Sequence, residues 1–429
     1  MKFINSPKKR LSATVYYLLA GLALGWPGLL ATGDLLPAWQ QGAISLALSL
    51  ATVHLLVLGS MWTIAFGVLY QIVPIAFQAQ PIPRHVLYWH LPIHILSIIL
   101  MVIGFLRLQF FVVGSGGILL FCNTVAYFLL LGRSYFYARN KTAVHKSLSI
   151  PLSAMGLVIL VGLFQAFFPS QISLPLLLTH VLLGGFAFWG GLVLVFSYKL
   201  VPMFIISHGY KTSLIRSGSL YFVAVALWIV SNWLPDELLS RVVQGVSCVL
   251  LLTSLVLYVR DMIAIGRAHK KRTIVLPMWD ASLAMVFLVL GQAGIVIATA
   301  FHTTFWVYPS AYLFAFGGLI ALMYSYMQKM VPFLWFEYRF SKRPERKTAP
   351  LIDDMVPKRI AQWGMVLYFM GVIAGVVGLL DLRIHPLLLW LSWVSAVCMT
   401  LGSMLLFVAL RFVLTIGGTR PVDCNTNYS

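Results

Sequence analysis

Long apolar runs, separated by short polar or basic segments, divide this chain of 429 residues. A helix needs about 20 apolar residues to cross a bilayer, and twelve stretches reach that length. Because a spanning helix keeps its backbone hydrogen bonds within itself, the pattern predicts an all-α polytopic membrane protein, one integral domain over residues 1–429. The expected spans are approximately 13–33, 43–74, 86–106, 110–132, 148–168, 175–204, 217–235, 242–260, 281–301, 308–334, 360–380 and 386–412.

Three of the apolar runs end in similar segments, which read GVLYQIVPIAF, FSYKLVPMF and YMQKMVPFLWF. Aligned on the Val-Pro pair, Pro74, Pro202 and Pro332 lie 128 and 130 residues apart. A fixed period indicates a repeated structural unit. We therefore expect three pseudo-repeats of four helices, each with the motif on its second helix. The three pseudo-repeats cover approximately 11–146, 147–275 and 276–416. A connecting cytoplasmic loop is expected at 337–358 and a polar tail at 419–429.

The composition supports a membrane protein and not a soluble one. The chain is 60% hydrophobic and 10% charged, whereas soluble domains are about a quarter charged. The net charge of +19 does not indicate nucleic-acid binding, because 27 of the 30 Lys and Arg residues fall in alternate loops or at their edges. This positive-inside pattern places both termini in the cytoplasm of a bacterial-type cytoplasmic membrane. The lipid bilayer is the expected partner.

Histidine is the ionisable residue that occurs within the expected spans, away from the membrane surface. His54 lies 20 residues before Pro74, and His180 lies 22 residues before Pro202. At 1.5 Å of rise per residue, their depths differ by about 3 Å, so both could face one internal space. Neutral imidazole is a ligand for haem iron and for copper. We expect His54 and His180 to bind haem, with copper as an alternative. The other interpretation is that each histidine hydrogen-bonds a neighbouring helix.

The third repeat departs from this pattern. Ser310 and Tyr312 stand at the positions that match the two histidines. His302 lies further out, and we expect it in the loop before the tenth span, where it would be hydrated unless it folds back as a ligand. None of the eleven Asp and Glu residues lies mid-span. A carboxylate proton relay or a carboxylate-coupled ion transporter therefore has no obvious residues to use.

A second pair of histidines, His90 and His94, lies at positions i and i+4 near the start of the third span. This spacing puts both side chains on one helix face and can chelate a metal ion. Pro92 stands between them, however, and the position is close to the membrane surface. The sequence therefore favours an interfacial, hydrated pair.

The two histidine helices carry a family resemblance. HLLVLGSMWTIAFGVLYQIVP, over His54–Pro74, and HVLLGGFAFWGGLVLVFSYKLVP, over His180–Pro202, are similar to the His-x-x-x-x-Gly…Val-Pro helices of two groups. These groups are the haem–copper oxidase subunit I superfamily and the NnrS-type membrane proteins associated with nitric oxide stress. The resemblance implies that His54 is an axial haem ligand and that His180 is the counterpart of a copper ligand. It also implies redox or nitric-oxide handling.

Two departures limit what the resemblance implies. The seventh span, SLYFVAVALWIVSNW, lacks the adjacent histidines of the oxidases, and the tenth, YPSAYLFAFGG, lacks their haem ligands. A second axial ligand would then be His180, His302 or Tyr312, and oxygen reduction with proton pumping is not expected. Oxidase or electron-transfer subunits are the implied partners. The alternative is a cofactor-free transporter or oxidase assembly protein, which would use mid-span groups such as Gln165 and Gln292.

Overall fold

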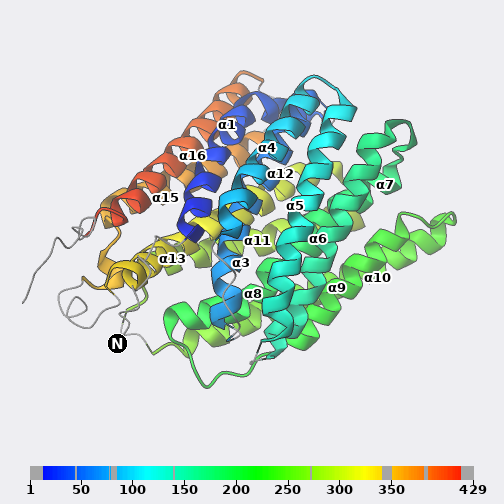
Figure 1. Ribbon diagram of the computed structural model, residues 1–429. Coiled ribbons are helices and arrows are strands. Elements are labelled where there is room, and N and C mark those ends of the chain that lie inside the picture. The colour runs from blue at the N-terminus through cyan, green and yellow to red at the C-terminus, as the bar shows by residue number, and fades with distance from the viewer. Residues whose placement is uncertain are drawn as a thin grey trace, which may run out of the picture.

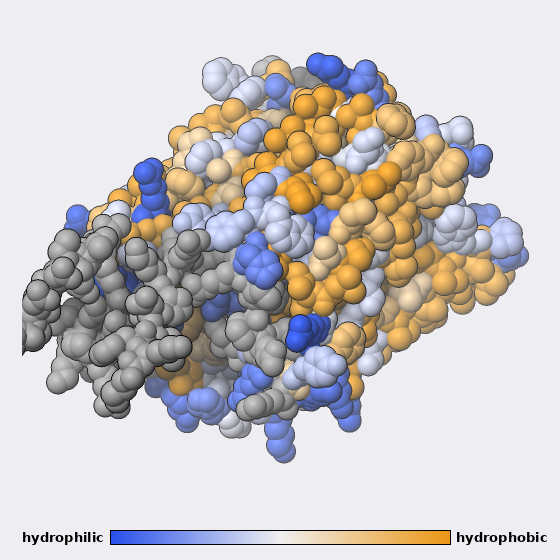
Figure 2. Space-filling view, viewed as in Figure 1, coloured by the Kyte–Doolittle hydropathy of each residue, from blue (hydrophilic) through white to orange (hydrophobic). Residues whose placement is uncertain are grey.

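The computed structural model describes residues 13–43, 46–76, 78, 85–138, 141–270, 273–340, 350–380 and 385–416. Within them, twelve helices are long and apolar enough to cross a membrane, so the expected all-α polytopic membrane fold is confirmed. Figure 2 shows apolar side chains over the flank of the bundle and hydrophilic ones gathered at its ends. This distribution is the one that a lipid-embedded bundle requires.

The second span of each set of four is interrupted, so the helices outnumber the spans. The first set comprises α1 (Ala13–Gln40), α2 (Ala47–His54), η1 (Leu55–Trp62), α3 (Thr63–Ala76), α4 (Val86–Leu106) and α5 (Phe110–Phe136). The second comprises α6 (Ala143–Phe167), α7 (Leu174–Val181), η3 (Leu182–Gly190), α8 (Gly191–Ile205), α9 (Leu214–Ser231) and α10 (Glu237–Arg267). The third comprises α11 (Leu276–Ala300), α12 (Val307–Tyr312), η5 (Leu313–Ile320), α13 (Ala321–Arg339), α15 (Lys358–Leu380) and α16 (His385–Val413).

The same packing relation recurs in the three sets. The first helix of each set packs on the motif span of that set, and the third and fourth helices pack on each other. The fourth helix then contacts the first helix of the next set, through α5 with α6 and α10 with α11. The ring closes where α16 packs along α1, at the two ends of the chain (Figure 1). The three motif spans are the most buried of the twelve spans, so the histidine-bearing helices lie inside the ring.

Each motif span changes from α-helix to π-helix and back. The π segments η1, η3 and η5 begin 19, 20 and 19 residues before the motif prolines. Glycines let neighbours approach these wide turns closely. A Cβ on Gly318 would lie 2.7 Å from the Leu288 Cα atom of α11, and one on Gly190 would lie 2.1 Å from the Tyr221 hydroxyl. π-Helical turns are rare and are frequent at functional sites.

A side chain from the third helix of each set bonds the π segment at one equivalent place. The carbonyl oxygens of Leu58, Phe186 and Phe316 each lie 16 residues before a motif proline. They accept hydrogen bonds from His94 Nε2 at 3.1 Å, the Tyr221 hydroxyl at 3.2 Å and the Tyr368 hydroxyl at 3.1 Å. A change of helix type leaves a backbone carbonyl without its regular donor. This hydrogen bond therefore satisfies a carbonyl oxygen for which the lipid has no donor.

The connection between the tenth and eleventh spans is shorter than expected. Helix α13 continues to Arg339 and α15 begins at Lys358, so the first three residues of the expected 337–358 loop are helical. A short helix, η6 (Ile352–Asp354), lies in this connection. Its Asp353 forms an ion pair with the buried Lys329 of α13. The expected polar tail, 419–429, lies outside the described residues.

Candidate functional site

The structure brings His54 and His180 together. His54 is the last residue of α2, and His180 lies one residue before the end of α7, so both precede a π segment. Their ring centroids are 6.3 Å apart and the ring planes are inclined by 32°. The two residues are 126 positions apart in sequence. The pair therefore exists only because the motif spans of two different sets lie side by side inside the ring.

The ring of His54 is held from two sides. Its Nδ1 lies 2.8 Å from the Leu50 carbonyl oxygen, one helical turn earlier, and its face lies on Phe105 with centroids 4.5 Å apart. A carbonyl oxygen can only accept a hydrogen bond, so Nδ1 carries the proton. The neutral ring then has its lone pair on Nε2. Metal-binding histidines are oriented in this way, with the second nitrogen donating to a carbonyl.

The ring of His180 lies against a glycine of α6. Its Nδ1 is buried and makes no hydrogen bond. On α6, a Cβ on Gly162 would lie 3.0 Å from the His180 Cε1 atom. The His180 ring therefore fits against α6 because Gly162 has no side chain.

The separation of the two rings fits a shared metal centre. A metal–imidazole bond is about 2.0 Å and a ring centroid lies about 1.1 Å behind the nitrogen, so rings on opposite sides of one ion have centroids about 6 Å apart. The observed 6.3 Å matches this value. Two imidazoles complete the coordination of haem iron, whose other four ligands belong to the porphyrin. His54 and His180 are therefore the residues that could hold a haem.

A metal ion held by protein ligands alone usually has three or four of them. No group of three or more His, Cys, Asp or Glu side chains with metal-binding geometry occurs within the described residues. The donor set therefore suits haem better than an isolated zinc or copper ion.

Two other predicted ligands do not join the pair. The hydroxyl of Tyr312 lies 2.8 Å from Ser395 Oγ and 3.5 Å from Met399 Sδ, both on α16. It therefore faces the interior of the third set of helices. His302 is exposed after the end of α11, with a φ of 52°. No ring contact or hydrogen bond between it and either histidine occurs in the described part of the chain.

The expectation for the second histidine pair was wrong. His90 and His94 are fully buried, each with 0% exposure, and are not interfacial. The face of α4 that carries them packs on η1 and α5. Tyr17 and Asn123, which contact His90, were missed in the sequence. An amide in the middle of an apolar run was the available signal for Asn123.

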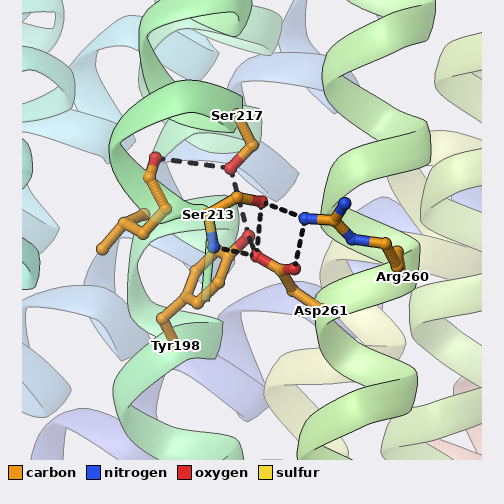
Figure 3. Close-up of polar contacts among 6 residues, drawn as sticks. Tyr198, Ser213, Ser217, Arg260 and Asp261 are labelled. Carbon is orange, nitrogen blue, oxygen red and sulfur yellow. Dashed lines mark hydrogen bonds and ion pairs between the residues drawn. The ribbon is translucent and has the colours of Figure 1, made fainter. Parts of the chain in front are cut away.

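A buried carboxylate, Asp261, lies near the end of α10 and is fully engaged (Figure 3). Its Oδ2 accepts hydrogen bonds from the Ser213 backbone N–H at 2.5 Å, from Ser213 Oγ at 2.7 Å and from the Tyr198 hydroxyl at 3.0 Å. Arg260 lies 3.3 Å from Oδ1. With its acceptor sites filled by donors from the start of α9 and from α8, Asp261 ties three helices together and has a structural role.

A small cavity lies where the three motif spans meet. Its volume is about 60 Å³, and apolar side chains of α3, α8 and α13 line it, among them Leu69, Phe196 and Met330. The cavity lacks polar partners for water and is far smaller than a porphyrin. It does not include either histidine of the His54–His180 pair. The candidate site is therefore the histidine pair and not this cavity.

A search of protein-family models finds no match to this chain, and a search of curated proteins finds no significant match.

Proposed function

We propose that this membrane protein binds haem between His54 and His180 and uses it for redox or nitric-oxide handling. In this proposal it is a divergent relative of oxidase subunit I and of NnrS-type proteins, without proton-pumping oxygen reduction. The observation that carries the proposal is the pair of imidazoles, whose ring centroids lie 6.3 Å apart on two separate helices, with Nδ1 of His54 bonded to the Leu50 carbonyl so that its Nε2 carries the lone pair. Copper in the same place is the second form of the proposal.

The residues around the pair have distinct tasks in this function. The Leu50 carbonyl fixes the tautomer of His54, so that Nε2 points its lone pair away from the helix. Phe105 covers one face of the ring. The absent side chain of Gly162 leaves the space in which His180 stands. A bound haem supplies one-electron chemistry and an iron that binds small diatomic ligands.

The two histidines are held differently. Nδ1 of His54 donates to the Leu50 carbonyl, whereas Nδ1 of His180 is buried without a hydrogen-bond partner. His54 and His180 would hold the haem, and the haem would supply electron transfer or the binding of small diatomic molecules.

The membrane setting is part of the proposal. The basic loops place both termini in the cytoplasm of a bacterial-type cytoplasmic membrane. The histidine pair then lies in the outer part of the bilayer, at the ends of α2 and α7 that are directed toward the cytoplasm. An electron-transfer or oxidase subunit docking on that side would be the natural redox partner.

The test is a spectrum of the purified protein. After haem-replete expression, we expect a Soret band, a change between reduced and oxidised spectra, and iron that co-purifies with the chain. Copper without haem would select the second form of the proposal. No Soret band together with no iron and no copper would overturn both forms and favour a cofactor-free transporter or assembly protein. Co-purification with a terminal oxidase would favour an accessory subunit.

A further inference from the structure

His94 occupies a place where the other two sets of helices use tyrosine. His94, Tyr221 and Tyr368 each donate to the carbonyl that lies 16 residues before a motif proline. A tyrosine does this with its single polar atom at the ring tip. A histidine adds a second nitrogen, and the Nδ1 of His94 is buried without a hydrogen-bond partner. The structural bond alone therefore does not explain why the first set has histidine.

His90 repeats the arrangement one turn away. Its ring is parallel to that of His94 within 5°, and the centroids are 6.4 Å apart. Four residues of α-helix rise about 6.0 Å, so the rings stand in succession along α4. His90 Nδ1 lies 2.5 Å from the Tyr17 hydroxyl, and His90 Nε2 is buried without a partner. Each ring thus has one nitrogen engaged and one unpartnered.

Helix α5 adds two more unpartnered atoms. Asn123 Nδ2 donates to the His90 carbonyl oxygen at 3.1 Å, which holds this side chain in the seam between α4 and α5. Its Oδ1 has no partner, and neither does Thr124 Oγ1. Both residues are 2% exposed. We call His90, His94, Asn123 and Thr124 the α4–α5 cluster.

The chemistry of these atoms specifies what they lack. The Leu58 carbonyl can only accept, so His94 carries its proton on Nε2 and has a bare lone pair on Nδ1. Asn123 Oδ1 is also an acceptor. Both therefore need a donor, and an unpartnered buried polar atom costs about 1–3 kcal/mol. An ordered water costs at most about 2 kcal/mol and bonds about three groups, so hydration is favoured over a dry cluster.

We propose that ordered water fills the α4–α5 cluster, donating to His94 Nδ1 and Asn123 Oδ1, and makes it a proton-exchanging site inside the membrane. An imidazole takes a proton on one nitrogen and releases another from its second nitrogen. Water at the free nitrogens therefore lets protons exchange between the bound water and both rings.

A metal ion suits the cluster less well. The rings are displaced along one helix and parallel, and no Cys, Asp or Glu joins them in a metal-binding group within the described residues. Two neutral imidazoles would leave a divalent charge uncompensated in a low-dielectric interior. Metal binding is therefore kept as an outcome of the test that would overturn the water assignment.

The first experiment uses the unmodified protein. Brief X-ray irradiation generates hydroxyl radicals from bound water, and mass spectrometry locates the labelled side chains. Phe66 lies 4.6 and 5.2 Å from the two rings, and Tyr127 lies 5.0 Å from His90. We expect their labelling to exceed several-fold that of Phe316 and Tyr368, two buried aromatic residues of the third set. Equal labelling of the two sets would overturn the proposal.

The second experiment uses a shape-matched apolar variant. In a dry cluster, Thr124→Val removes an unsatisfied atom and breaks no hydrogen bond, so it raises the melting temperature. In a hydrated cluster the same change strands the water and lowers it, which is the result that we expect.

A second variant removes only the acceptor nitrogen. His94→Tyr copies the other two sets, and it should lower the labelling of Phe66 several-fold while the Soret band persists. If the unmodified protein contains iron, copper or zinc that is lost in His94→Tyr, the occupant of the cluster is that metal and not water. His54→Ala should leave the labelling of Phe66 unchanged, so failure of the haem proposal does not affect this one.

Discussion

The two histidine pairs of this protein have almost the same ring separation, 6.3 Å for His54–His180 and 6.4 Å for His90–His94. Their origins differ. The first separation is produced by two helices from different parts of the chain, and its rings are inclined by 32°. The second is one turn of a single helix, and its rings are parallel within 5°. Equal distances therefore do not indicate equal chemistry.

The difference between the pairs lies in what the free nitrogens face. Across the helix interface, the rings approach from two backbones, so an ion or a flat macrocycle can be gripped from both sides. Along one helix, the parallel rings stand 6.4 Å apart, and each has one nitrogen without a partner. The first pair suits metal coordination, and the second suits a chain of hydrogen bonds between ring nitrogens and water. The predictions below test that distinction, from the largest expected effect to the smallest.

The largest effect is expected from His54→Ala. Loss of an axial ligand should remove at least nine-tenths of the haem absorbance per chain, since even weaker perturbations around a metal lower affinity about 10- to 100-fold. His94→Ala is the matched control and should retain the absorbance. The Soret absorbance relative to protein measures both. Equal losses in the two variants would show that the pairs do not have separate roles.

A smaller effect is expected when a new side chain on α6 occupies the position of the His180 ring. In Gly162→Leu the new side chain starts 3.0 Å from the His180 ring, so the ring must move. Overpacking of this kind costs about 1–3 kcal/mol, and we expect a several-fold lower haem affinity. Gly156→Leu is the control on the same helix, because a Cβ there meets nothing within 4 Å. Haem titration distinguishes them, and identical affinities would contradict the assignment.

A stability change without a cofactor change is expected from Tyr221→Phe and Tyr368→Phe. Each variant leaves the π-segment carbonyl of Phe186 or Phe316 without its donor, and Tyr221→Phe also removes the 2.8 Å hydrogen bond from the Tyr221 hydroxyl to Gln292 Oε1. We expect a loss of about 1 kcal/mol in each case, seen as a lower melting temperature in detergent. The haem spectrum should not change. An unaltered melting temperature in both variants would mean that these bonds do not support the π segments.

The smallest effect is expected from His302→Ala. This residue is exposed, and surface substitutions usually change stability by less than about 0.5 kcal/mol. Haem content and melting temperature should both match the unmodified protein. A fall in haem content would instead identify His302 as an axial ligand and separate His180 from that role.

The sequence predicted some parts of the site well and others badly. His54 and His180 were found together because the Val-Pro period put both at one depth on equivalent helices. Tyr312, selected by the same alignment, points to Ser395 and Met399 of α16. A period identifies equivalent backbone positions, but the direction of a side chain depends on local helix geometry.

The burial of His90 and His94 could not be read from their position. They lie near the start of an apolar run and beside Pro92, where hydration is the usual outcome. The structure gives both 0% exposure because α5 and η1 cover that face of α4. Asn123 of α5 and Leu58 of η1 supply the hydrogen bonds to the two residues, and nothing near residue 90 in the sequence indicates either one.

Hydropathy and period by themselves determined that this protein lies in lipid, that it has twelve spans and that a similar motif-bearing span recurs at three places. These are properties of continuous segments, set by the free energy of moving an apolar run from water to lipid. Only the tertiary structure decided which imidazoles meet, which carbonyls need a donor and which nitrogens remain unpartnered. Those outcomes depend on neighbours that are distant in sequence, because a side chain inside a helical bundle faces whatever the adjacent helices bring to it.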